Sequence, residues 1–168
     1  RTMRQSIING QTRKDYWIGK ILVMIAISLA ATILYFLSCI FLGVTHTEGY
    51  ELSIIWDNNF ANIRFFLMCT GYLSFAMFLA YLIRKGTLTI LIYFAYIMFV
   101  EIIVRAIHLN YFKHRSVLFY PMNVIEDLMP NPFLRIPDFM AKDQFDFKIL
   151  LSYNEAMLVS VLYISIFI

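Results

Sequence analysis

The stretch that decides the fold is RTMRQSIINGQTRKDYWIGK (residues 1–20), followed directly by ILVMIAISLAATILYFLSCIFLGV (residues 21–44). The first segment carries five basic residues and one acid, whereas the second carries no charge over 24 residues. A helix needs about 20 apolar residues to cross a bilayer, and basic residues are enriched on the cytoplasmic side. The two segments together predict a cytoplasmic basic leader that runs into a membrane span.

Aromatic and basic side chains mark the place where the leader meets the membrane. Tyr16 and Trp17 precede the apolar run, and Lys20 follows within one helical turn. Tyrosine and tryptophan rings favour the headgroup level, so we predict that these three residues anchor the chain at the membrane interface. The boundary divides a cytoplasmic coupling segment, residues 1–17, from a span at residues 18–44.

Two local motifs predict how the leader folds. The sequence TRKD at residues 12–15 is a capping box, in which the first and last side chains satisfy free backbone amides, so a helix is expected to begin at Arg13. Gly10 can adopt a positive φ and end a preceding short helix over roughly residues 3–9. The leader is therefore predicted to be a short helix, a glycine turn and the capped start of the span.

Composition favours a membrane protein. Hydrophobic residues make up 61% of the 168-residue chain and charged residues 15%, and the mean hydropathy is +0.71. These values lie outside those of average soluble domains. The net charge of +3 comes from basic residues beside apolar runs, so it indicates topology rather than a nucleic-acid partner. Cys39 and Cys69 lie inside apolar runs, where we expect small buried residues rather than a disulfide or metal pair.

Three further apolar segments follow the first span. They occupy residues 64–83, 88–111 and 155–168. The turn at residues 84–87 holds two basic residues, whereas the connector at residues 45–63 holds three acids and no lysine or arginine. The distribution of lysine and arginine places the turn in the cytoplasm and the connector outside.

The last apolar segment is too short to cross a bilayer. As a helix it is about 20 Å long, against a hydrocarbon core of about 30 Å. We therefore expect the final span to be truncated and further spans to lie beyond both ends of the sequence. The predicted fold class is an all-α polytopic membrane domain with four visible transmembrane helices.

The stretch at residues 112–154 follows the third span and is predicted to be external or re-entrant. It contains all four prolines of the chain and is rich in phenylalanine. Irregular backbone at membrane depth must pack against protein, so we expect short helices here. Pro121 can open one of them over residues 122–129. Its predicted apolar face comprises Val124, Ile125, Leu128 and Met129.

The leader resembles a link found in ABC-2 type permeases of bacterial ABC transporters. The residues that carry the resemblance are Arg4-Gln5-x-Ile7-Ile8-Asn9-Gly10-x-Thr12-Arg13-Lys14-x-x-x-x-Gly19-Lys20, which run directly into a span. In that family the link lies between the second and third of six spans and includes the coupling helix that docks on the ATPase. The proline-framed segment Tyr120–Pro132 also resembles the external region before the last span of these permeases.

The resemblance implies a set of partners and contact residues. It implies a separate ABC ATPase, which would bind ATP and magnesium, a second permease subunit as a homo- or heterodimer, and a bacterial inner membrane. No cofactor would bind this chain directly. The residues that would contact the ATPase are Arg4, Gln5, Ile7, Ile8, Gly10, Arg13 and Lys14.

Two charged residues interrupt the third apolar segment. Glu101 and Arg105 are spaced i, i+4, which places them on one helical face, and His108 follows. Ionisable residues inside a span are costly and mark functional sites by default. One interpretation is a self-paired brace that fixes helix rotation, and the other is a role in a substrate path or gate. We expect the three histidines of the chain to lie at the surface.

The sequence carries no catalytic or metal-binding motif. The favoured hypothesis is thus the membrane-spanning permease subunit of an ABC-2 type exporter, which couples ATP hydrolysis by its partner to substrate translocation. The alternative is a non-transporting, ABC-like membrane anchor or a component that transmits force or a signal. An intramembrane enzyme is the third hypothesis, and the lack of a nucleophile, base or metal set argues against it.

Overall fold

The computed structural model describes residues 10, 12–46, 60–129 and 150–168. All regular structure within these ranges is helical. The elements are α2 (Arg13–His46), α4 (Phe60–Ile83), α5 (Gly86–Ala95), the π-turn η1 (Tyr96–Val100), α6 (Glu101–Phe112), the 3-10 turn η2 (Arg115–Phe119), α7 (Pro121–Asp127) and α9 (Tyr153–Phe167). The all-α prediction is therefore confirmed for the described part of the chain.

Three continuous helical stretches are long and apolar enough to cross a membrane. They are Arg13–His46, Phe60–Ile83 and Gly86–Phe112. Each extends beyond the apolar run that predicted it, and the extension of the first includes the charged residues from Arg13 to Asp15. The predicted spans at residues 18–44, 64–83 and 88–111 lie inside these helices. The fourth predicted span corresponds to α9, a shorter apolar helix of 15 residues.

The start of α2 has the predicted capping box. The Asp15 N–H donates to Thr12 Oγ1 at 3.2 Å, and an Asp15 carboxylate oxygen accepts from the Thr12 N–H at 3.2 Å and the Thr12 hydroxyl at 2.6 Å. Gly10 has φ +87°, the positive value expected of a turn before this helix. The predicted helix over residues 3–9 lies outside the described residues.

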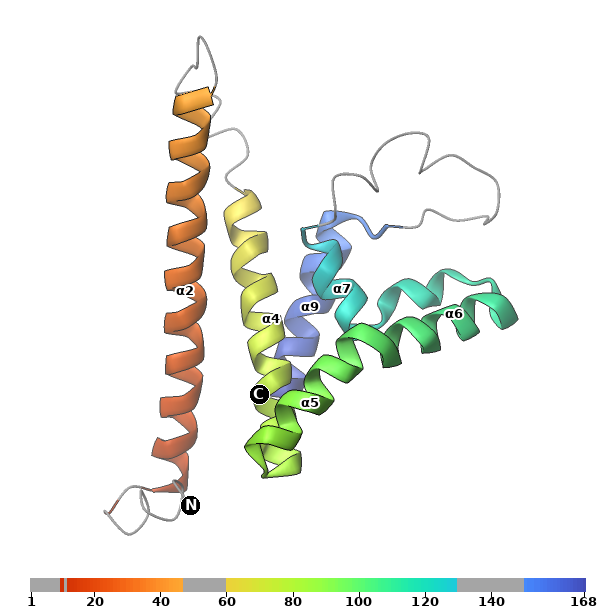
Figure 1. The fold of residues 1–168 in the computed structure, drawn as a ribbon, viewed down its shortest axis with the longest axis horizontal. Helices are drawn as coiled ribbons and strands as arrows, with labels where there is room; N and C mark the ends of the chain where they lie inside the picture. The colour runs from red at the N-terminus through yellow and green to blue at the C-terminus, as the bar shows by residue number, and fades with distance from the viewer. Residues whose placement is uncertain (1–9, 11, 47–59, 130–149) are drawn as a thin grey trace.

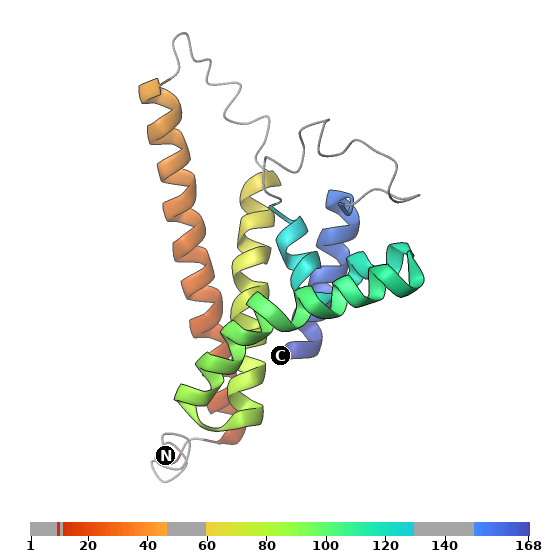
Figure 2. The same cartoon turned by 45° about the vertical axis from the view of Figure 1, so that its right-hand side comes forward.

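Helix α4 is the centre of the described fold. It packs against α2, α5, α7 and α9. Figures 1 and 2 show α2 running alongside it, while α5, η1 and α6 leave its lower end and cross the molecule obliquely. Buried small residues let α4 approach its neighbours, because Ser74 is fully buried and Gly71 lies against the side chain of Ile125 on α7.

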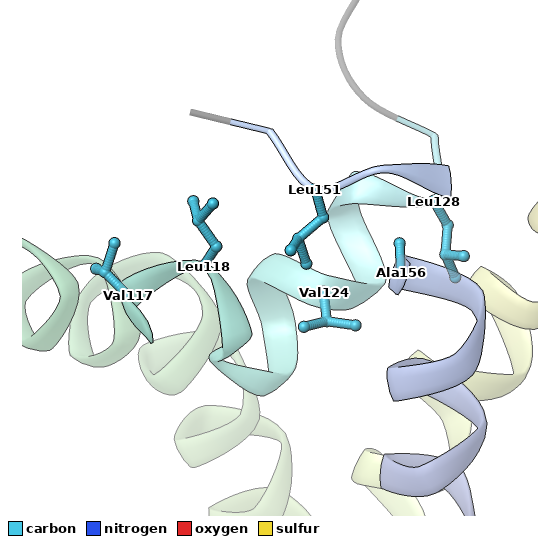
Figure 3. Packing of buried hydrophobic residues seen from close by; sticks show 6 residues of the cluster. All are labelled: Val117, Leu118, Val124, Leu128, Leu151 and Ala156. Carbon is cyan, nitrogen blue, oxygen red and sulfur yellow. The ribbon is translucent and has the colours of Figure 1, made fainter. Parts of the chain in front are cut away.

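The best-packed region lies where η2, α7 and the start of α9 meet. Its buried residues are Val117, Leu118, Val124, Leu128, Leu151 and Ala156 (Figure 3). Phe75, Met122 and Ile125 form a second cluster between α4 and α7. The predicted short helix is confirmed: Pro121 is its first residue, and three of its four predicted apolar residues are fully buried.

The prediction for the cysteines is wrong at one position. Cys69 on α4 is partly buried, but Cys39 on α2 is exposed, and both are free thiols. The difference follows from the packing, because α2 contacts the rest of the described fold mainly along one side, against α4. Position within an apolar run does not distinguish that side from the others.

Candidate functional site

Glu101 forms the centre of a buried polar network. Its side chain is 3% exposed, and its two carboxylate oxygens accept hydrogen bonds from the backbone N–H groups of Met122 at 3.1 Å and Asn123 at 2.8 Å. These amides belong to the first turn of α7, where Pro121 has no N–H to offer. A carboxylate at this position satisfies free donors and complements the positive end of the helix dipole.

Tyr96 and Arg105 complete the surroundings of this carboxylate. The Tyr96 side chain lies beside the Glu101 carboxylate, and the positive charge of Arg105 acts on both Glu101 and Asp127. Glu101 and Arg105 lie one turn apart in α6, yet no ion pair within 4 Å joins these two described residues. Arg105 Nε is buried without a hydrogen-bond partner. The geometry thus differs from a simple Glu–Arg brace, because the carboxylate binds α7.

Asp127, at the other end of α7, forms the second part of the network together with Asn123. An Asp127 carboxylate oxygen accepts from the Leu151 N–H at 3.1 Å and from the Asn123 amide at 3.2 Å. The same Asn123 amide donates to the Leu118 carbonyl at 2.7 Å. Burial raises the pKa of Asp127 to about 6, and its bond to the Leu151 N–H opposes that shift. These bonds join η2, α7 and the start of α9.

His108 extends the polar face of α6 toward η2. Its Nδ1 lies 3.2 Å from the Tyr120 hydroxyl, and its Nε2 lies 2.9 Å from Ser116 Oγ. The side chain is half-buried in this contact, so the surface position expected of His108 is only partly correct. His114 is exposed, and its Nδ1 accepts from the Ser116 N–H at 3.1 Å.

The outer end of the network is held by contacts to α9. Arg115 forms an ion pair with Glu155 at 2.6 Å, and the Tyr163 hydroxyl donates to the Phe119 carbonyl at 2.6 Å. Ser152 and Glu155 form a capping box at the start of α9. The η2–α7 segment is therefore tied to α6 on one side and to α9 on the other.

A buried cation, Arg64, lies near the N-terminal end of α4. Arg64 is 8% exposed, and its guanidinium lies 3.7 Å from the centre of the Tyr153 ring on α9. Arg64 Nε has no hydrogen-bond partner. The cation–π contact offsets part of the cost of burying this charge and fixes α9 against α4.

The leader residues predicted to contact a partner are described only in part. Gly10, Arg13 and Lys14 are exposed at the start of α2. Arg4, Gln5, Ile7 and Ile8 lie outside the described residues. Exposure leaves the three described residues accessible to another protein or to lipid headgroups.

The predicted interface anchors have aromatic contacts. Trp17 meets Tyr81 of α4 with ring centroids 5.5 Å apart, and Lys20 Nζ lies 5.5 Å from the centre of the Tyr16 ring. The Trp17 contact joins the first part of α2 to the last part of α4. Trp17 therefore also joins two helices, a role that its position beside the apolar run does not reveal.

Two residues of the network, Asn123 and Asp127, were missed by sequence reasoning. Asn123 and Asp127 have an available signal, because their i, i+4 spacing places an amide beside a carboxylate on one face of the short helix. Within the described ranges, no group of three histidine, cysteine or acidic side chains could hold a metal ion.

Comparisons with family models, with curated proteins and with solved structures find no match for this chain. The functional evidence is therefore the chain's own residues and their geometry.

Proposed function

We propose that this chain is the membrane-spanning subunit of an ABC-2 type transporter in a bacterial inner membrane and that it serves export. The observation that carries the proposal is the basic leader motif from Arg4 to Lys20, which runs directly into the long apolar helix α2. The positive φ of Gly10 and the capping box at Thr12 support it, because they define a turn between the motif's first half and α2. A separate ATPase would supply ATP hydrolysis.

Helix α2 offers a route from the leader to the buried network. Its aromatic contacts with α4 lie at Trp17–Tyr81 and at Tyr35–Phe65, whose rings stack at 4.3 Å. Helix α4 in turn packs on α7 and α9. Movement of the leader by a closing ATPase dimer would therefore reach α7 through packed helices, which is a rigid-body form of coupling.

Replacement of Arg4 and Ile8 by alanine tests the proposal. Neither residue belongs to a predicted span, so expression and insertion should be unchanged, while the ATPase should dissociate during purification or hydrolyse ATP without transport. Lys85→Ala is the matched control, because it removes an exposed basic residue at the start of α5. A double variant that retains its ATPase and transports normally contradicts the proposal.

The same preparation tests the alternative of a force-transmitting membrane anchor. In liposomes containing the chain and its ATPase, a transporter should show ATP hydrolysis stimulated by candidate substrates and ATP-dependent movement of substrate across the bilayer. An anchor should retain the ATPase and show neither effect. If the chain is purified from its native host with the leader intact and no ATPase accompanies it, both hypotheses are excluded.

A further inference from the structure

A π-turn interrupts the third apolar helix directly before Glu101. In this turn, η1, the Glu101 N–H donates to the Tyr96 carbonyl five residues back. A π-turn accommodates about one residue more than the α-helical turn that it replaces, and π-helices make up well under 1% of residues in globular proteins. Contacts elsewhere must therefore stabilise this turn against regular α-helix.

The helix that follows the π-turn has one polar face and one apolar face. Glu101, Arg105 and His108 lie on the polar face and meet α7, Asp127 and η2 as described above. Ile102 and Ile103 are each more than half exposed. The rotation of α6 about its own axis therefore decides whether its polar face meets η2 and α7.

We propose that α5–α6 has two registers and that η1 and Glu101 form a latch for α7. In the latched register, which the structure shows, η1 absorbs one extra residue and directs Glu101 to the amides of α7. In the second register η1 becomes regular α-helix, and α6 rotates by about 100°, the angle of one residue. The rotation carries Glu101, Arg105 and His108 away from η2 and α7. This inference does not depend on the transport proposal.

A disulfide reporter can measure whether α7 is docked on α4. A Cβ built on Gly71 lies 3.0 Å from Ile125 Cγ1 and 3.4 Å from Ile125 Cγ2. Both atoms are bonded to the Ile125 Cβ, so the two Cβ atoms of a Gly71→Cys/Ile125→Cys pair lie within the disulfide range of about 3.5–4.5 Å. Cys39 and Cys69 are replaced by alanine in this background, and oxidation is followed in native membranes holding the full chain.

Deletion and insertion at one point of the turn then test the two registers. Deletion of the exposed Phe99 should convert η1 to α-helix without rotating Glu101, so the pair should oxidise at least as fast as in the parent. Insertion of one alanine after Phe99 should rotate Glu101 by about 100° and slow oxidation at least tenfold. If oxidation slows equally in the deletion and insertion variants, or if its rate changes in neither, the proposal is overturned.

Glu101→Ala tests the latch at unchanged chain length. It should slow oxidation at least tenfold, because the carboxylate no longer favours the π-turn, while the neighbouring exposed control Ile102→Ala should oxidise like the parent. Adding the Phe99 deletion to Glu101→Ala should recover at least half of the parent's rate, since only the latched register remains. The double variant must insert into the membrane and be monodisperse. If its oxidation rate then does not recover, Glu101 acts only through its hydrogen bonds, and the two-register proposal is rejected.

Discussion

Asp127 is a buried carboxylate whose protonation affects the stability of the fold. It is 5% exposed, and burial raises its pKa from the ordinary value of 3.8 to about 6. A raised pKa in the folded state means that the ionised form is penalised. The stabilisation that protonation provides is therefore complete below about pH 4 and is lost as the pH rises through about 6.

Asp127→Asn should stabilise the purified protein at neutral pH. The amide oxygen can still accept from the Leu151 N–H and the Asn123 amide, while the buried charge is removed. The gain at pH 7.5 should not exceed about 3 kcal/mol, the free energy of a two-unit pKa difference, and should shrink toward pH 4. Thermal unfolding of both proteins in detergent across this range provides the measurement. A stability difference between the two proteins that stays the same across this pH range contradicts the prediction.

Glu101 differs from Asp127 because its hydrogen-bond partners are the amides of a helix N-terminus. Glu101→Gln should destabilise the fold by about 2–4 kcal/mol, since it removes two charge-assisted hydrogen bonds and directs an amide NH₂ toward backbone donors. Adding Arg105→Gln should not restore stability, because Arg105 is not the partner that Glu101 loses. Restoration by the double change, measured by thermal unfolding, would instead identify a Glu–Arg brace.

These residues show how far the sequence predicts the site. A charge inside an apolar run is a visible signal, so Glu101 and Arg105 could be selected before the fold was known. The partners of Glu101 could not, because backbone amides of Met122 and Asn123 are common to every residue type except proline. Only the docking of α7 against α6 distinguishes them.

Among the elements, α7 shows the strongest agreement between sequence and structure, because Pro121 marks its start and its apolar positions are buried. The π-turn η1 could not be predicted. It lies in a run that is apolar on all sides, and hydrophobic periodicity there does not separate 3.6 residues per turn from a wider turn.

The contact between α4 and α7 leads to a prediction at the scale of elements. Gly71→Ala places a Cβ 3.0 Å from two Ile125 side-chain carbons, so it should destabilise the fold by about 1–3 kcal/mol despite the higher helix propensity of alanine. Ile125→Ala alone should cost about 2–5 kcal/mol through the cavity it creates. The double change should cost clearly less than the sum, and additivity in a thermal double-mutant cycle would show that the two helices do not meet here.

For the whole molecule, the distribution of basic residues predicts topology. In a background without Cys39 and Cys69, a cysteine at Glu51 should react with a membrane-impermeant thiol reagent in intact spheroplasts, whereas one at Lys85 should react only after the membrane is opened. Lys85 is exposed between α4 and α5. If a cysteine there does not react with the reagent, the membrane and not burial in the protein is the reason. Labelling of Lys85→Cys in intact spheroplasts would invert the proposed orientation.

The whole-molecule architecture was predictable in its helical class and in the order of its long apolar helices. The oblique path of α5–α6 was not, because it depends on how α6 docks on η2 and α7 (Figure 2). Segment length fixes whether a helix can cross a bilayer, while its direction is set by packing against neighbours.

The uninterrupted length of α2 makes it a single long element. Its 34 residues span about 51 Å, and aromatic pairs hold it to α4 at two places about 27 Å apart, Trp17–Tyr81 and Tyr35–Phe65. A push of about 2 Å at Arg13 would therefore carry α4 along with α2, unless it first breaks the contact between Trp17 and Tyr81.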